Sequence, residues 1–163
     1  MPLRLTVPGV PDLYQGGELW DLSLVDPDNR RPVDYARRRQ LLASVGRRDE
    51  PVDLGRDECG ESKLRLIHRL LQHRRRRPTA RPTIYEPLPV SGERDGDVGA
   101  FTRGDLVTVV PLLGDDRWGD TNVGVPNGRW VDLVTGATHD GGRVALHDLF
   151  ARFPVAVLGR EAP

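Results

Sequence analysis

The regular spacing of apolar residues is clearest in residues 61–76. Leu64, Ile67 and Leu71 recur at intervals of three and four, and Leu70 reinforces the stripe that they form. Arginines gather at the C-terminal end of the segment, where the negative end of the helix dipole favours cations. The pattern predicts an amphipathic α-helix over residues 61–76, which the prolines that follow would end.

Other segments in the first half of the chain have weaker patterns. Residues 33–45 (VDYARRRQLLASV) place apolar side chains at helical spacing and predict a second helix. Residues 3–7 form a short apolar run that Pro8 ends, which predicts a buried strand leading into a loop. The segments up to Pro32 and from residue 46 to 60 are rich in turn formers and charges, and we expect loops there.

After residue 80 the apolar residues alternate instead of following helical spacing. Turns such as Asn127-Gly128 and Gly141-Gly142 separate the alternating runs. Short strands interrupted at close intervals are typical of antiparallel sandwiches and barrels. The predicted strands are residues 83–85, 97–103, 106–113, 122–125, 129–135, 143–146 and 154–158. We therefore expect an α/β piece over residues 1–80 and an all-β domain over residues 81–163.

Composition adds a few constraints. The chain has 163 residues, 37% of them apolar, and its 24 basic residues balance 24 acidic ones. A chain without net charge has no electrostatic reason to bind a polyanion or an anionic membrane, so we expect neither nucleic acid nor a membrane as partner. Cys59 is the only cysteine, which excludes an internal disulfide and favours a cytoplasmic location. No apolar run approaches the ~20 residues that cross a bilayer, and the N-terminus has no signal-peptide pattern.

The sequence lacks the common metal and nucleotide motifs. His68 and His73 are five residues apart, which does not place two ligands on one helix face, and no acidic residue completes an HExxH pattern. GxGxxG, Walker and GxSxG motifs are absent from the sequence. We therefore predict no metal site and no cofactor. The arginine run at residues 74–77 could contact phosphates, but capping the helix end is the simpler role.

Residues 8–31 (PGVPDLYQGGELWDLSLVDPDNRR) crowd proline, glycine, aromatic and charged residues together, as functional loops do. With its continuation PVDY, this stretch is similar to the last barrel strand and following loop of α-amylase superfamily enzymes. The segments KLRLIHRLLQHRRR, YEPLPVSGERDGDVGAFTR, PNGRWVDLVTG and DLFARFPVAVL extend the likeness. Over essentially its whole length, the chain resembles the C-terminal portion of the malto-oligosyltrehalose synthase family within that superfamily.

The resemblance implies a fold. Residues 1–80 would hold the last strand and helices of a (β/α)8 catalytic barrel, and residues 81–163 the antiparallel β-sandwich that follows it. A complete barrel needs about 250 residues, so this chain would contain only its end. The expected fold class is therefore an α+β fragment.

The resemblance also implies a reaction. The family converts the reducing-end α-1,4 linkage of a maltooligosaccharide to an α,α-1,1 linkage by intramolecular transglycosylation. Such retaining chemistry uses two carboxyl groups about 5 Å apart. In this superfamily they follow earlier barrel strands, so the resemblance assigns no catalytic residue to this chain. The chain by itself is expected to be inactive.

The loop after the last strand would form part of the substrate-binding rim, because barrel active sites are built from the loops at the carboxyl ends of strands. Its acidic and arginine side chains offer donors and acceptors for sugar hydroxyls, and its aromatic side chains offer flat faces for pyranose rings. The candidate substrate-binding residues are Asp26, Asp28, Arg30, Arg31, Tyr14 and Trp20.

Three interpretations remain open. The chain could be the C-terminal piece of a trehalose-forming transglycosidase, a subunit of a split enzyme whose barrel is a separate polypeptide, or a free carbohydrate-binding β-sandwich. Maltooligosaccharide is the expected ligand. Trp118 and Trp130 are expected to pack in the β core rather than to bind sugar. Arg37, on the second predicted helix, is expected to lie on the surface without a role in binding.

Overall fold

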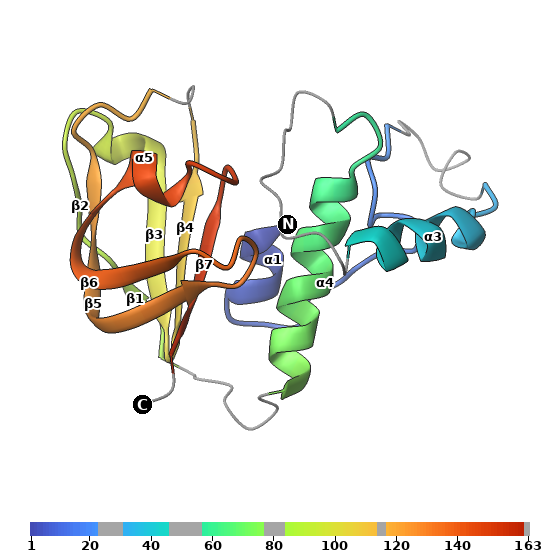
Figure 1. The fold of residues 1–163 in the computed structure, drawn as a ribbon, viewed down its shortest axis with the longest axis horizontal. Coiled ribbons are helices and arrows are strands. Elements are labelled where there is room, and N and C mark those ends of the chain that lie inside the picture. Colours follow the sequence, from blue (N-terminus) through green and yellow to red (C-terminus); the bar gives the residue numbers. More distant parts are fainter. Residues whose placement is uncertain (23–30, 46–56, 77–83, 114–116, 162–163) are drawn as a thin grey trace.

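The computed structural model describes residues 1–22, 31–45, 57–76, 84–113 and 117–161. It is a small α+β fold in which two helices, residues 2–6 and 61–76, lie beside a curled antiparallel sheet, and a third helix, residues 35–45, lies on the far side of residues 61–76 (Figure 1). The helical segments are α1 (Pro2–Thr6), α3 (Tyr35–Val45), α4 (Glu61–Arg76), the 3-10 turn η2 (Asp95–Asp97) and α5 (Leu146–Leu149). The strands are β1 (Glu86–Pro87), β2 (Val90–Ser91), β3 (Val98–Arg103), β4 (Leu106–Pro111), β5 (Asn122–Asp132), β6 (Thr138–Ala145) and β7 (Ala156–Arg160).

Strand β5 gives the sheet its curl. The strands follow the order β1-β3-β4-β7-β5-β2, and β6 also pairs with β5. The first residues of β5 pair with β2 and β6, whereas its last residues, from Trp130, pair with β7 and β6. The register with β6 shifts between Val125 and Arg129. Such an irregularity bends a strand and increases its twist, so the sheet closes partly on itself.

The sheet separates two hydrophobic cores. Along β7, Ala156 and Leu158 face the interior of the curl, and Val157 between them faces the helices, as strand alternation requires. Inside the curl, Trp130 is the largest fully buried side chain. On the outer face the second core joins the helices to the sheet through Leu5, Leu66, Ile67, Leu70, Val134, Phe153 and Val157. Burying a side chain of this size stabilises the fold by about 1.5–3 kcal/mol, so the outer core holds α1 and α4 firmly against the sheet.

Two arginines satisfy the C-terminal end of α1. The Arg74 guanidinium donates to the carbonyl oxygen of Leu5 at 3.2 Å. The Arg103 guanidinium donates to the carbonyl oxygens of Thr6 at 3.2 Å and Val7 at 2.8 Å. The last carbonyls of a helix have no partner within the helix, so these bonds cap it. Part of the arginine run therefore has a structural task within the fold.

The predicted strand over residues 3–7 is wrong, because Pro2–Thr6 form α1. A strand of a parallel barrel sheet needs hydrogen-bonded neighbours, and the described residues supply none for this segment. A helix satisfies its backbone by itself, and proline is tolerated in its first turn. Leu5 is buried as predicted, but against α4 and the outer face of the sheet.

Both helices that the sequence predicts are present. The helix over residues 61–76 is confirmed with the same bounds. The helix predicted over residues 33–45 begins two residues later, at Tyr35. The predicted division of the chain near residue 80 falls among residues that the structure does not describe.

The predicted antiparallel β part is present, with different strand boundaries. The predicted strands 122–125 and 129–135 overlap the two ends of one long strand, β5. Ile84 and Tyr85 lie outside the strands, and the chain enters the sheet only at β1. Hydrogen bonds join the strands into one curled sheet. The sequence could not show this, because the two halves of β5 are separated by the turn-like Pro126-Asn127-Gly128.

Within the described residues, no helix combines the length and apolar character needed to cross a membrane. In the same part of the chain, no group of three or more His, Cys, Asp or Glu side chains could hold a metal ion.

Candidate functional site

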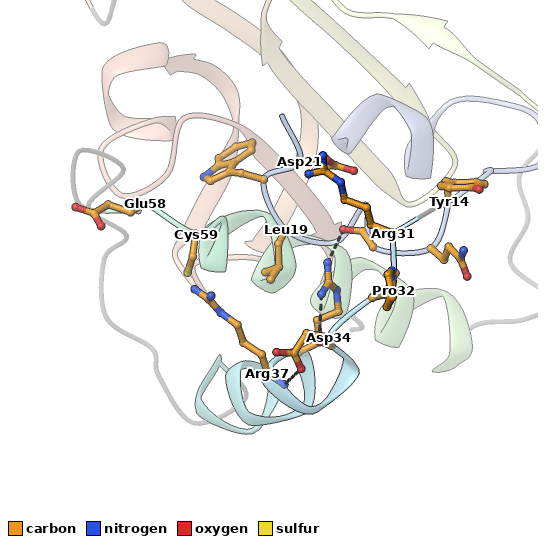
Figure 2. A pocket seen from close by; sticks show the side chains of 14 residues that line it. Tyr14, Leu19, Asp21, Arg31, Pro32, Asp34, Arg37, Glu58 and Cys59 are labelled. Atoms are coloured by element: carbon orange, nitrogen blue, oxygen red, sulfur yellow. Dashed lines mark hydrogen bonds between the residues drawn. The ribbon is translucent and has the colours of Figure 1, made fainter. Parts of the chain in front are cut away.

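A cleft of about 460 Å³ opens between three parts of the chain. They are the N-terminal loop (residues 14–21), the start of α3 with the residues before it (31–38), and the segment before α4 (58–59). Figure 2 shows Tyr14, Arg31 and Pro32 on one side of it, Glu58 and Cys59 on the other, and Asp34 with Arg37 along α3. Leu19 lies between these walls. The lining comes from residues 14–16, 19–21, 31–34, 37–38 and 58–59.

The N-terminal loop contacts the start of α3 at a turn formed by Gly16 and Gly17. The N–H of Gly17 donates to the carbonyl oxygen of Tyr14 at 3.0 Å. Gly16 has a φ of +85°, and a Cβ there would lie 3.3 Å from Val33 and 3.4 Å from the Arg38 guanidinium. Both the backbone conformation and the close approach favour glycine at this position. The turn thus brings the N-terminal loop directly against the start of α3.

Arg38 ties the two sides of this junction together. Its Nε donates to the Glu18 carboxylate at 3.2 Å, and its Nη2 donates to the carbonyl oxygen of Gly16 at 2.9 Å. Its Nη1 donates to the carbonyl oxygen of Asp34 at 3.1 Å. The Asp34 carboxylate in turn accepts the N–H of Arg37 at 2.9 Å, which caps the N-terminus of α3. One guanidinium therefore holds the loop and the helix start in a fixed relation.

Asp57 organises the opposite wall by capping α4. Its Oδ1 accepts the N–H groups of Gly60 at 2.8 Å and Glu61 at 2.7 Å, and its Oδ2 accepts the N–H and hydroxyl of Ser62. Partial burial alone would raise the pKa of Asp57, but the hydrogen bonds from Ser62, Glu61 and Gly60 outweigh it and lower that pKa. A charged cap of this kind fixes the chain just before α4, where Glu58 and Cys59 line the cleft.

Trp20 is fastened to this capped segment. Its backbone N–H donates to the carbonyl oxygen of Cys59 at 3.2 Å, and its indole Nε1 donates to the carbonyl oxygen of Asp57 at 2.9 Å. The Lys63 ammonium donates to the carbonyl oxygen of Leu19 at 2.9 Å and lies 5.5 Å from the centre of the Trp20 ring. Burial lowers the pKa of Lys63. The indole ring is thus held in a defined orientation although Trp20 as a residue is half exposed.

The structure brings three of the six predicted site residues to the cleft. Tyr14, Trp20 and Arg31 all line it. Asp26, Asp28 and Arg30 lie outside the described residues, so their assignment stays a prediction. In the β part, Trp118 and Trp130 are 6% and 1% exposed, which confirms that they pack in the core.

Several lining residues were not found by sequence reasoning. Arg37, expected to be an uninvolved surface residue, lines the cleft, and so do Arg38, Glu58 and Cys59. One feature of the sequence could have indicated that the arginines line a site. Three arginines stand near the start of α3, whose first turn has no acidic residue, although the helix dipole disfavours cations there. Glu58 and Cys59 carry no such signal, because only the fold brings the start of α4 beside the loop.

The chain is similar in sequence to two curated proteins. No family model matches the chain. Two Mycobacterium tuberculosis proteins, from strains CDC 1551 / Oshkosh and ATCC 25618 / H37Rv, are described as maltooligosyl trehalose synthases and are each 41% identical over 98% of this chain. The chain spans only 20% of the length of these curated relatives.

Solved structures extend the likeness to the fold. The maltooligosyltrehalose synthase from Arthrobacter ramosus matches with a TM-score of 0.87 at 38% identity, covering 98% of this chain and 21% of that one. A structure described as DSM5389 glycosyltrehalose synthase matches with a TM-score of 0.76 at 28% identity, over 98% of this chain and 19% of that one. By sequence and fold together, the chain is homologous to the C-terminal portion of the maltooligosyltrehalose synthases.

Proposed function

We propose that this chain serves as the C-terminal part of a maltooligosyltrehalose synthase. The observation that carries the proposal is the match over 98% of the chain, at 41% identity in sequence and at a TM-score of 0.87 in fold. In this proposal, residues 1–80 complete an α-amylase-type catalytic barrel, and residues 81–163 are the antiparallel β domain that follows it.

The proposed reaction is an intramolecular transglycosylation in trehalose biosynthesis. The reducing-end α-1,4 linkage of a maltooligosaccharide would be converted to an α,α-1,1 linkage with retention, which requires a nucleophilic carboxylate and a carboxylic acid about 5 Å apart. Both would come from polypeptide outside these residues, and the chain alone would be inactive. No residue of this chain is assigned a catalytic role.

The cleft is the part of the chain proposed to contact the sugar. The residues Tyr14 and Trp20 are 58% and 50% exposed, and their aromatic side chains suit stacking on pyranose rings. Arg31 adds hydrogen-bond donors at the same cleft. Asp26, Asp28 and Arg30 belong to the same proposed rim on sequence grounds alone.

In a second form of the proposal, the barrel is a separate polypeptide that binds this chain as its partner. Apolar side chains around the helical part are unusually exposed, with Val10 at 96% and Leu22 at 89%. Exposed apolar surface of this kind fits a further polypeptide that would cover it. A free carbohydrate-binding sandwich has less support, because Trp118 and Trp130 are buried and cannot serve as a sugar platform.

A chimera tests the proposed function. The matching fifth of the Arthrobacter ramosus synthase is replaced by residues 1–163, and the product formed from maltopentaose is analysed for a non-reducing, trehalosyl-ended sugar. We expect the chimera to form this product, and the truncated synthase without the replacement to form none. A folded chimera that binds maltopentaose but never forms the α,α-1,1 linkage would refute the proposal.

A further inference from the structure

The three arginines of the cleft differ in how their guanidinium groups are engaged. Arg38 uses its Nε, Nη1 and Nη2 to hold the loop and the start of α3. Arg31 also has an interaction within the protein. Among the described residues, none bonds to the guanidinium of Arg37, and its backbone N–H donates to the carboxylate of Asp34. Within the described ranges, the side-chain donors of Arg37 are therefore available to a ligand in the cleft.

The place of Arg37 in its helix also costs stability. It is the third residue of α3, whose first turn contains no acidic side chain. A cation there opposes the helix dipole, and within the part of the chain that the structure describes Arg37 makes no ion pair in return. Sequences depart from local preferences of this kind mainly at functional sites. In Figure 2 the Arg37 side chain extends from α3 across the cleft toward Cys59.

The charges around the cleft indicate which kind of ligand it suits. The carboxylates of Asp21, Asp34 and Glu58 line it together with the guanidinium groups of Arg31, Arg37 and Arg38, so three negative charges balance three positive ones. A phosphate or sulfate would gain little from such a balanced lining. A neutral polyhydroxylated ligand can both donate to carboxylates and accept from guanidinium groups, and it can stack on the exposed aromatic rings.

We propose that Arg37 is a ligand-contacting residue of this cleft and donates its guanidinium N–H groups to hydroxyl oxygens of a neutral polyhydroxylated ligand. Arg38 is the positioning residue behind it and acts by holding the loop against α3. The choice of an α-1,4-glucan as that ligand rests on the proposed function. The role of Arg37 itself rests on the geometry and charge of the cleft.

The test is a titration of residues 1–163 with maltopentaose, followed by calorimetry or by NMR. Three variants are compared with the unchanged chain: Arg37→Gln, Arg38→Gln and the matched control Arg39→Gln, an exposed neighbour on α3 that does not line the cleft. Arg37→Gln is expected to weaken binding about 10- to 100-fold and to leave the melting temperature unchanged. Arg38→Gln should lower both affinity and melting temperature, and Arg39→Gln neither.

Three results would overturn the proposal. The first is the absence of maltopentaose binding by the unchanged chain. The second is an Arg37→Gln affinity equal to that of Arg39→Gln. The third is binding of inorganic phosphate that depends on Arg37, which would make the cleft an anion site. The chimera assay is independent of this titration, because an active chimera combined with any of these results would rule out sugar binding by Arg37 and leave the proposed function standing.

Discussion

Helices α3 and α4 lie next to each other and are both rich in arginine, yet different forces hold them. In α4, six side chains are buried, among them Leu66, Ile67 and Leu70 against the outer face of the sheet. In α3 only Val45 is buried, and Leu42 and Tyr35 are 37% and 50% exposed. Hydrophobic burial therefore places α4. A small apolar contact and a set of directional polar bonds place α3.

This difference bears on the cleft. The wall supplied by the start of α4 rests on a large core, whereas the wall supplied by α3 rests on Arg38, Asp34 and the contact of Val45 with Leu19 and Leu64. A binding wall held by few contacts can adjust at little cost in free energy. Substitutions in each helix test whether α3 and α4 are held by different forces.

The largest effect is expected from removing a core side chain of α4. Leu70 is 3% exposed, and Leu70→Ala should lower the free energy of unfolding by about 2–5 kcal/mol through lost burial and a residual cavity. The matched change in α3, Leu42→Ala, should cost about 0.5 kcal/mol or less, because that side chain remains partly in water. Urea titrations of both variants measure the difference. Equal losses would show that α3 is held by packing after all.

A comparable effect is expected at the junction between the cleft and α4. Gly60 has a φ of +87°, and a Cβ there would lie 2.4 Å from the backbone nitrogen of Trp20. Gly60→Ala should therefore cost about 1–2 kcal/mol for the left-handed backbone and about 1–3 kcal/mol more for the clash.

Gly136→Ala is the control for this prediction. Gly136 has a φ of +75°, but a Cβ there would meet nothing within 4 Å, so only the backbone cost should remain. Denaturation curves of the two variants separate the backbone cost from the clash. If both glycines respond alike, Trp20 and the segment before α4 are not packed as closely as the structure shows.

The smallest effect is expected from the cap of α4, and it depends on pH. Asp57→Ala should cost about 1 kcal/mol at pH 7, a typical value for a lost N-cap. Because folding lowers the pKa of Asp57, its carboxylate stabilises the protein above the ordinary aspartate pKa of about 3.9. That contribution is lost as the pH falls through the lower pKa of the folded state.

Unfolding measurements of the unchanged chain and of Asp57→Ala between pH 7 and pH 3 check this. The stability difference between the two should be constant near neutral pH and should shrink in acid. A difference that grows in acid would contradict the direction given for the pKa of Asp57.

Part of this molecule was predictable from local pattern. Residues 61–76 bury one stripe, so their periodicity alone defined α4, and the alternating runs after residue 80 defined an antiparallel sheet. The loop rich in aromatic and charged residues indicated where a site would lie, and Tyr14, Trp20 and Arg31 do meet at one cleft. In each case the signal comes from residues close together in the chain.

Other features depended on contacts between distant residues. Residues 3–7 have the same apolar character as a strand, and whether they extend or coil depends on which partners satisfy their backbone. The bend of β5, the bond from the Trp20 indole to Asp57 and the position of Arg37 in the cleft all join segments that local pattern treats separately. Local patterns along the chain were enough to identify the segments that bury a face and some of the residues that line the cleft. The tertiary structure decided which of those residues meet, because hydrogen bonds and close packing depend on distances in space that periodicity along the chain does not encode.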